Sequence, residues 1–319
     1  MRDAILNFPK QFAYEPVIEN ADKLGKFGKY VVCGMGGSSL GADLLRVLSP
    51  DIDVYVHRNY GLPNLHEYAN TLIIANSYSG NTEETIDAFN EALKKKYPIA
   101  VVSTGGQLLN MAQERSLPYI QMPSTGIQPR MATGFNIRAL LTLFGNARLL
   151  EETGTLPTTL NPNEYEADGR DLASRIKNAI PIIYASEINQ PVAYNWKIKF
   201  NETGKIPAFY NVLPELNHNE MTGLDVKEST EKLSSNFYFI FLHDVDDHPR
   251  IQKRMEVLKA LYLNRGLSVG SIEMKGVNTS HKVFSSLMVA DWTALYTAEQ
   301  YGLESEQVPM VEEFKRLIA

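Results

Sequence analysis

Short apolar runs rich in β-branched residues alternate along the chain with longer amphipathic stretches, a pattern that predicts strands and helices in turn. The expected strands are 29–36, 53–59, 71–80, 98–106, 118–123, 181–186, 236–244 and 267–274. The expected helices are 38–48, 81–96, 107–115, 136–151, 191–203, 249–265, 281–301 and 310–319. Acidic residues lie early and lysines late in 81–96, as the helix dipole prefers. This alternation predicts an α/β fold with parallel sheets covered by helices.

A polar, turn-rich segment at 152–168 interrupts the pattern. Threonine, proline, asparagine and acidic residues make up most of it, which is typical of a boundary between domains. The chain has 319 residues, enough for two domains with a core each. We therefore expect two similar three-layer αβα sandwiches with mostly parallel sheets, one formed by 1–155 and the other by 156–319.

Composition and charge narrow the classes of protein to which the chain can belong. Its 31 Lys and Arg against 37 Asp and Glu give a net charge of −6, which argues against a nucleic-acid partner. The single cysteine, Cys33, excludes an internal disulfide, and its apolar surroundings indicate a core residue. Neither a signal peptide nor an apolar run of the ~18–20 residues that cross a bilayer is found, so we expect a cytoplasmic protein with no membrane partner.

The segment 34–39 (GMGGSS) lies where the first expected strand ends and a helix begins. Backbone N–H groups at a helix start favour an anion, the glycines allow close approach, and Ser38 adds a hydroxyl donor. A structural turn is the alternative. A dinucleotide site is disfavoured, because Ser39 replaces the last glycine of G-x-G-x-x-G and His57 and Arg58 stand where that site has an acid.

The segment 77–82 (SYSGNT) also follows an apolar strand and opens a helix. Its three hydroxyls and one glycine can surround a phosphate without the lysine of a nucleotide-binding P-loop. Helix capping by Thr82 is the alternative reading of this segment by itself. Since both loops follow carboxyl ends of strands expected in one sheet, together they predict one bound anion at a shared crevice.

These loops and four longer segments resemble the bifunctional phosphoglucose/phosphomannose isomerases, whose domains have the sugar isomerase (SIS) fold. The segments are 129–135 (PRMATGF), 200–223 (FNETGKIPAFYNVLPELNHNEMTG), 243–255 (HDVDDHPRIQKRM) and 308–318 (VPMVEEFKRLI). The similarity covers nearly the whole chain. It implies two SIS domains, the second with a C-terminal helix that returns to the active site, a sugar phosphate partner, and no metal or other cofactor. The implied reaction converts glucose 6-phosphate and mannose 6-phosphate reversibly to fructose 6-phosphate, by proton transfer through a cis-enediol.

The resemblance also implies roles for individual residues. Glu202 matches the glutamate that shuttles the proton, and Arg130 matches an arginine beside the enediolate. His218 and Lys315 match groups that open the sugar ring. The matches to sugar-phosphate contacts are Gly36, Gly37, Ser38, Ser77, Ser79 and Thr82. In the family the histidine reaches the neighbouring subunit's site, which implies a homodimer.

Local sequence leaves a simpler alternative open for Glu202. It lies near the end of the expected helix 191–203, with Gly204 as the C-cap. A carboxylate at the negative end of a helix dipole is a stronger proton acceptor, which suits a base. The alternative is a solvated surface acid paired with Lys205.

The other three matched side chains have ordinary alternatives as well. His218 could be polar surface in a loop, and Arg130 an isolated surface arginine. Lys315 could point outward from an amphipathic end helix. Val308 stands where some archaeal relatives have threonine, so a hydroxyl near the sugar is missing.

The segment 243–248 (HDVDDH) has the residue types of a metal site. It also fits a helix start, with Pro249 in the first turn and Asp246 or Asp247 near the cap. We favour the helix start and expect no metal there.

Two other functions are open alongside isomerisation of glucose 6-phosphate and mannose 6-phosphate. A sugar-phosphate-sensing SIS module would explain both loops, but it would leave Glu202 and His218 without a role, and no helix-turn-helix segment is found. The isomerase half of a glucosamine 6-phosphate-forming amidotransferase would need an N-terminal cysteine nucleophile, whereas this chain begins MRDAIL.

Overall fold

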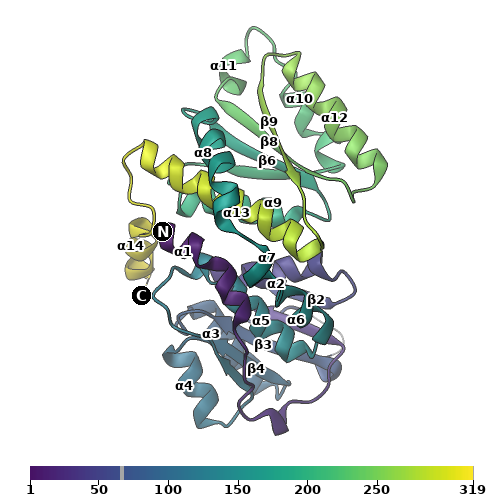
Figure 1. Cartoon of the computed structure of the whole chain (residues 1–319). Helices are drawn as coiled ribbons and strands as arrows, with labels where there is room; N and C mark the ends of the chain where they lie inside the picture. Colours follow the sequence, from purple (N-terminus) through teal and green to yellow (C-terminus); the bar gives the residue numbers. More distant parts are fainter. Residues whose placement is uncertain (65–67, 319) are drawn as a thin grey trace. The chain divides into compact units, whose positions relative to one another are not determined.

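The computed structural model describes residues 1–64 and 68–318 and divides the chain into two compact units. The N-terminal unit is Asn7–Leu160, and the C-terminal unit combines Met1–Leu6 with Asn161–Ala319 (Figure 1). The first residues pack with the second unit through Arg2, whose Nη1 donates to the Glu166 carboxylate at 3.0 Å. The linker between the units lies inside the turn-rich segment 152–168.

The N-terminal unit contains a five-stranded parallel sheet in the order β2-β1-β3-β4-β5. The strands are β1 Lys29–Cys33, β2 Asp53–His57, β3 Thr71–Ser77, β4 Ile99–Ser103 and β5 Tyr119–Gln121. The α-helices are α2 Gly37–Leu48, α3 Glu83–Lys94, α4 Gly106–Glu114, α5 Thr133–Phe144, α6 Ala147–Thr153 and α7 Leu156–Thr159. The 3-10 turns are η1 Phe8–Ala13, η2 Ala21–Lys23, η3 Tyr68–Asn70 and η4 Pro129–Met131.

The core of this unit forms because its central strand is buried along its whole length and apolar through its middle, from Leu72 to Ala75. On one face, side chains of β1 and β3 pack against Phe89 of α3 and Leu108 of α4. Cys33 lies in this cluster, as predicted, and burial raises the pKa of its thiol to about 12. The thiol is therefore a core group that stays protonated.

The C-terminal unit contains a four-stranded parallel sheet in the order β7-β6-β8-β9. The strands are β6 Ile180–Ser186, β7 Phe209–Leu213, β8 Phe237–Asp244 and β9 Ser268–Met274. The α-helices are α1 Arg2–Leu6, α8 Glu166–Arg175, α9 Gln190–Glu202, α10 Glu220–Gly223, α11 Glu231–Ser234, α12 Pro249–Leu263, α13 Thr279–Gln300 and α14 Pro309–Ile318. The 3-10 turns are η5 Pro162–Tyr165 and η6 Glu215–His218.

Helices cover both faces of the second sheet. Aromatic side chains of β6 and β8, among them Tyr184 and Phe239, pack against Tyr262 of α12 on one face. The helices α8, α9 and α13 cover the other face (Figure 1). Each unit is thus a three-layer αβα sandwich with a parallel sheet, and the predicted α/β fold class is confirmed.

The predicted strands and helices are present, but one of the helices is divided and several further elements were not predicted. The expected helix 136–151 is two helices, because Gly145 adopts a left-handed conformation (φ +66°) that ends the first. The helix α8 was not predicted, because its sequence is mostly polar, and neither were the short helices α1, α7, α10 and α11. The short strand β7 was not predicted. None of the helices in the described residues combines the length and apolar character needed to cross a membrane.

A buried ion pair joins two helices of the C-terminal unit. The Lys199 ammonium of α9 lies 2.6 Å from the Asp291 carboxylate of α13, and both side chains are almost fully buried. A buried charge that loses its partner costs far more than the intact pair contributes. The pair therefore fixes how α9, which ends at Glu202, lies on α13.

We expect Lys199→Met to lower the free energy of unfolding by about 3–5 kcal/mol, because Asp291 would keep a buried charge without its cation. Urea unfolding monitored by circular dichroism measures the change. The matched control, Lys199→Met with Asp291→Leu, removes both charges and should lose much less. Equal losses in the single and double variants would contradict the role of the ion pair.

Candidate active site

Two loops meet at the carboxyl edge of the N-terminal sheet, where the strand order places β1 beside β3. The first loop is 34–36 after β1, and the second is 78–82 after β3. The Tyr78 N–H donates to Ser38 Oγ at 2.8 Å, and Asn76 Nδ2 donates to the Ser38 carbonyl at 2.7 Å. The start of α2 is therefore fastened to the second loop, at the switch point where α/β sheets bind ligands.

The hydroxyls of the second loop are arranged by one another and by the backbone. Ser77 Oγ and Thr82 Oγ1 lie 2.8 Å apart, and the Gly80 N–H donates to Ser77 Oγ at 3.0 Å. The Asn81 N–H donates to Ser79 Oγ at 3.2 Å. Thr82 is the N-cap of α3, but its side chain makes no capping hydrogen bond. Its hydroxyl belongs to the loop cluster, which can donate to an anion at the edge of the sheet.

The first turn of α2 lies directly against η4, which carries Arg130. A Cβ on Gly37 would lie 2.5 Å from the carbonyl carbon of Pro129 and 2.6 Å from the nitrogen of Arg130. Glycine is thus required at this position. Arg130 is only 2% exposed, so it is not the surface arginine that its local sequence allowed.

Two buried asparagines, which were not predicted as site residues, support the first loop. Asn136 Nδ2 donates to Asn76 Oδ1 at 2.8 Å, and Asn76 in turn donates to the Ser38 carbonyl. Asn76 is fully buried in an otherwise apolar strand. A polar residue that interrupts such a run is the sequence signal that could have identified it, because buried amides need partners.

Arg58 occupies the place where a dinucleotide site has an acid, and it is engaged by neighbours. Its Nε donates to Ser39 Oγ at 3.0 Å, and it forms an ion pair with Asp43. Burial raises the pKa of the Asp43 carboxyl, against the opposing effect of Arg58. This pair links α2 to the end of β2 and favours a structural role for Arg58.

In the C-terminal unit, Glu202 is the last residue of α9 and is half-buried. The helix C-cap is Thr203 and not Gly204, and the Gly204 N–H donates to the Lys199 carbonyl at 3.0 Å. Lys205, with φ +60°, takes the left-handed conformation. Gly204 is instead needed for close packing, because a Cβ there would lie 2.8 Å from the Phe200 carbonyl oxygen.

His218 ends the 3-10 turn η6 and is exposed. Its flanking residues are held on both sides. Arg254 Nη1 donates to Asn217 Oδ1 at 3.1 Å, and the carboxylate of Glu220 accepts from the Tyr184 hydroxyl and from Asn211. Anchors before and after the histidine fix its backbone while its ring faces outward.

Lys315 lies on the exposed helix α14, where its ammonium pairs with Glu312 at 2.9 Å. Glu202, His218 and Lys315 thus come from three separate elements of the C-terminal unit. The residues matched to sugar-phosphate contacts lie on the two loops and helix starts of the N-terminal unit, beside Arg130. The matched roles themselves stay predictions.

The segment 243–248 forms a helix start, as favoured from sequence. Pro249 opens α12, but the capping side chain is His248, whose Nδ1 accepts from the Arg250 N–H at 3.1 Å, rather than Asp246 or Asp247. Lys282 donates to Asp244 at 2.8 Å and to Asp246 at 2.7 Å. Within the described residues, no group of three or more His, Cys, Asp or Glu is arranged to hold a metal ion.

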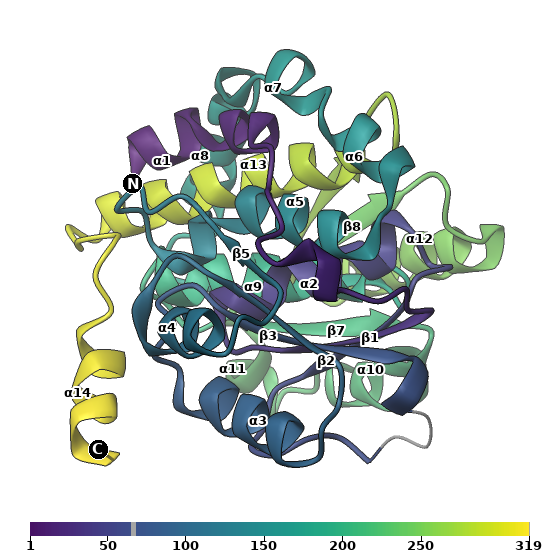
Figure 2. The ribbon, with the colours of Figure 1, turned by 90° about the horizontal axis from the view of Figure 1, so that it is seen from below.

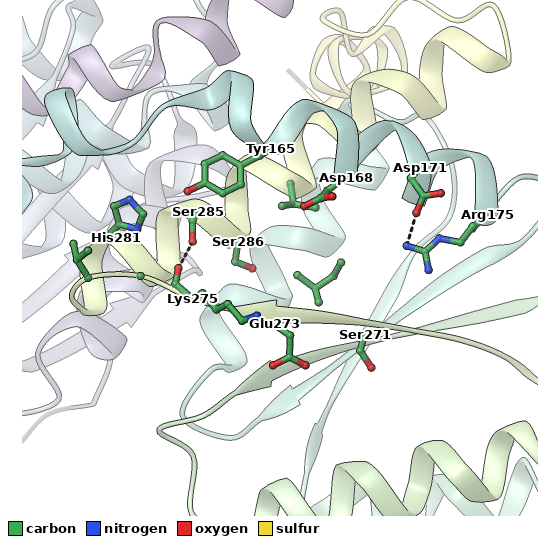
Figure 3. Close-up of a pocket in the computed structure, with 14 residues that line it drawn as sticks. Tyr165, Asp168, Asp171, Arg175, Ser271, Glu273, Lys275, His281, Ser285 and Ser286 are labelled. Carbon is green, nitrogen blue, oxygen red and sulfur yellow. Dashed lines mark hydrogen bonds and ion pairs between the residues drawn. The ribbon is translucent and has the colours of Figure 1, made fainter.

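A cavity of about 540 Å³ lies in the C-terminal unit between η5–α8, β9 and the start of α13. Figure 3 shows the Asp171–Arg175 pair on one side and Ser285, which donates to the Lys275 carbonyl, on the other. None of the predicted site residues lines it. Its acids and bases are mixed, so its charge does not select a ligand.

Comparisons with known proteins place these features in a family. The family profile described as "Bacterial phospho-glucose isomerase C-terminal SIS domain" matches residues 166–318. The bifunctional phosphoglucose/phosphomannose isomerase of Caldicellulosiruptor bescii is 34% identical over 100% of this chain and 99% of its own. The protein of the same name from Aquifex aeolicus is 31% identical over 97% of this chain and 95% of its own.

A solved structure agrees with the fold. A hypothetical protein of Thermus thermophilus superposes with a TM-score of 0.74 at 16% identity, covering 98% of this chain and 88% of that one. At this identity the similarity supports the two-sheet architecture alone. The full-length sequence matches carry the stronger conclusion. This chain belongs to the bifunctional phosphoglucose/phosphomannose isomerase family.

Proposed function

We propose that this chain interconverts glucose 6-phosphate and mannose 6-phosphate with fructose 6-phosphate. The observation that carries the proposal is a sequence match along 100% of the chain, at 34% identity, to a relative named bifunctional phosphoglucose/phosphomannose isomerase. The hydroxyl-lined loops of the N-terminal unit support it, because a phosphate is the ligand that such loops suit. A sensing module would explain the loops but not the glutamate, histidine and lysine matched in the C-terminal unit.

The phosphate binds at the switch point of the N-terminal sheet. Ser38, Ser77, Ser79 and Thr82 supply hydroxyls, and Gly36 and Gly37 let the backbone N–H groups at the start of α2 approach the phosphate oxygens. These donors are neutral, so they hold the phosphate by hydrogen bonds and helix dipoles without a lysine. The phosphate then orients the sugar chain for the chemistry at its other end.

Proton transfer is the chemical step, and Glu202 is its base. The carboxylate removes the proton from C2 of the open aldose, which leaves a cis-enediolate, and returns the proton to C1 to give the ketose. A second proton moves from the C2 hydroxyl to the oxygen on C1. Arg130 stabilises the negative oxygen of the enediolate, because its guanidinium keeps its charge throughout.

One enediol serves both sugars. Glucose 6-phosphate and mannose 6-phosphate are epimers at C2, and removal of the C2 proton erases their difference. A site that lets the C1–C2 bond rotate before enolisation accepts either epimer. Val308 lacks the hydroxyl that some relatives place near the sugar, so we expect mannose 6-phosphate to be the poorer substrate.

Ring opening precedes proton transfer and uses His218 and Lys315. We infer that the chain forms a homodimer in which His218 enters the site of the neighbouring subunit. The exposed position of His218, on a turn anchored by its flanking residues, supports this assignment.

The reaction moves only protons and needs no redox cofactor. Its substrates are charged and do not cross membranes, which favours an enzyme of the cytoplasm. We expect neither membrane nor nucleic-acid partners.

Glu202→Gln should lower the rate of fructose 6-phosphate formation about 10²–10⁴-fold with either sugar, because the amide cannot accept the proton. A coupled assay with glucose 6-phosphate and mannose 6-phosphate tested separately measures the loss. Glu187→Gln is the control, an exposed acid before the other end of α9, and it should keep the wild-type rate.

Other results of this assay would change the conclusion. Wild-type protein that is folded and binds sugar phosphate but forms no fructose 6-phosphate would reject the enzyme in favour of a sensing module. Activity with glucose 6-phosphate alone would keep the mechanism and point to Val308 as the reason for the lost epimer tolerance.

Co-expression of Glu202→Gln and His218→Gln chains tests the shared site. Each variant should be inactive by itself, whereas the mixture should recover about a quarter of the wild-type activity, because half the dimers are mixed and each has one intact site. The control is a mixture of Glu202→Gln with a chain that carries both Glu202→Gln and His218→Gln. It should be inactive, because none of its sites has Glu202. Isolated mixed dimers without activity would show that His218 acts within its own chain.

A further inference from the structure

The C-terminal helix α14 exposes an apolar face. Met310, Phe314 and Leu317 follow one another at helical spacing and are 81%, 59% and 78% exposed. Val311 and Ile318 extend the same face and are also exposed. Isolated exposed apolar residues are common, but five on one face of a ten-residue helix mark a surface that meets a partner.

Charged residues border this face of α14. On a helical projection at about 100° per residue, Glu313 falls beside Leu317 on one edge and Lys315 beyond Val311 on the other. The helix therefore presents an apolar stripe with an acid along one side. A complementary surface is apolar, with a cation along one side.

The C-terminal unit has a groove with that pattern. A cavity of about 370 Å³ lies between α12 and the segment that follows β7. Its apolar wall consists of Met221, Val257, Leu258 and Leu261. Arg250 and Lys253 are exposed at its basic end, where Lys253 pairs with Glu256 at 3.4 Å, so Arg250 is the cation that we assign to a partner. The ionisable residues that line the groove are all basic, which favours an acidic group of a partner at this end.

We infer that α14 of one copy of this chain docks in the α12 groove of a second copy. The apolar stripe of α14 then covers Met221, Val257 and Leu261, and Glu313 faces the basic end of the groove. The lengths agree, because Arg250 to Leu261 spans about 16 Å and α14 about 15 Å at the rise of an α-helix. Two such contacts, related by a two-fold axis, join the dimer.

A second copy is required because α14 does not reach the groove of its own chain. Lys205 Nζ donates to the Gln307 carbonyl, and the N-terminal ammonium of Met1 pairs with Glu306. These contacts hold the segment before α14 beside the ends of α9 and α1, on the sheet face opposite to α12. Figure 1 and Figure 2 both show α14 far from α12 within this unit.

This docking deepens the proposed function, on which its catalytic consequence rests. Asn217 lines the groove and directly precedes His218, and Arg254 of α12 fixes Asn217 at 3.1 Å. Lys315 borders the docked face of α14. The two ring-opening groups of one site would thus come from different copies, brought together by one helix–groove contact.

Phe314→Glu and Val257→Glu, made separately, test the two sides of the contact. Each places a charge in the apolar interface, so each should raise the dimer dissociation constant at least tenfold, measured by sedimentation or by light scattering across protein concentrations. Leu263→Glu is the matched control, because this residue is 51% exposed on the same helix but outside the groove, and it should leave the constant unchanged. Circular dichroism verifies that every variant is folded.

Charge reversal then tests the pairing directly. Glu313→Lys should weaken the dimer, and Arg250→Glu added to it should restore most of the lost affinity, because the pair is rebuilt with opposite sign. Restoration by Lys259→Glu, on α12 but outside the groove lining, would contradict the pairing. This rescue distinguishes a direct contact from a general change in net charge.

Three results would overturn the inference. The first is a wild-type chain that is monomeric at all concentrations. The second is a dimer that is unaffected by both Phe314→Glu and Val257→Glu. The third is a dimer that is weakened by Phe314→Glu but not by Val257→Glu. A different result would assign the face to lipid instead. In that case the wild type, but not Phe314→Glu, would bind phosphatidylcholine vesicles, and the two proteins would have the same mass in solution. The mass measurement needs no activity, so an inactive chain that dimerises through these faces would reject only the proposed isomerase.

Discussion

The close contact between the first turn of α2 and the Pro129–Arg130 backbone is the constraint on which the rest of the candidate site depends. No side chain fits at Gly37, because its Cβ would lie 2.5 Å from Pro129. This approach brings a buried arginine to the same sheet edge as the loop hydroxyls. A guanidinium on a flexible surface loop would be solvated, whereas one held by backbone packing can act on a bound anion at a defined place.

The loops around that contact are organised before any ligand binds. Asn136, Asn76, Ser38 and the Tyr78 N–H form a chain of hydrogen bonds from α5 to the second loop. Loss of one partner in such a chain leaves a buried polar group unsatisfied, at about 1–3 kcal/mol. The same bonds that stabilise the sheet edge therefore also hold its donors in place, so that the binding of the proposed phosphate would not have to order them.

The pattern of apolar and polar residues predicts most of this fold, because each buried strand and each amphipathic helix leaves a local signal. It misses α8, whose residues are mostly polar, and β7, where only Leu213 is buried and the other four positions are partly or fully exposed. For the site, the glycine- and hydroxyl-rich loops have a physical signature in the sequence. Lys315 has none, since a lysine on an amphipathic helix is ordinary, and only the resemblance to a family identifies it. The support of Ser38 by Asn76 and Asn136 depends on contacts across 60 residues that no local pattern contains.

The helix α14 shows a further limit of periodicity. Its apolar spacing indicates that one face is to be buried, and in most helices that face meets the core of the same chain. In this chain the face is exposed, while a basic groove of matching length stands on the opposite side of the same unit. Periodicity indicates that a face of the helix is to be covered, but not which molecule covers it. That depends on how far the segment that connects the helix to the rest of the chain can reach. Lys205 holds Gln307 two residues before α14, so the groove of the same chain is out of reach, and this is why we propose that a second copy supplies the complementary surface.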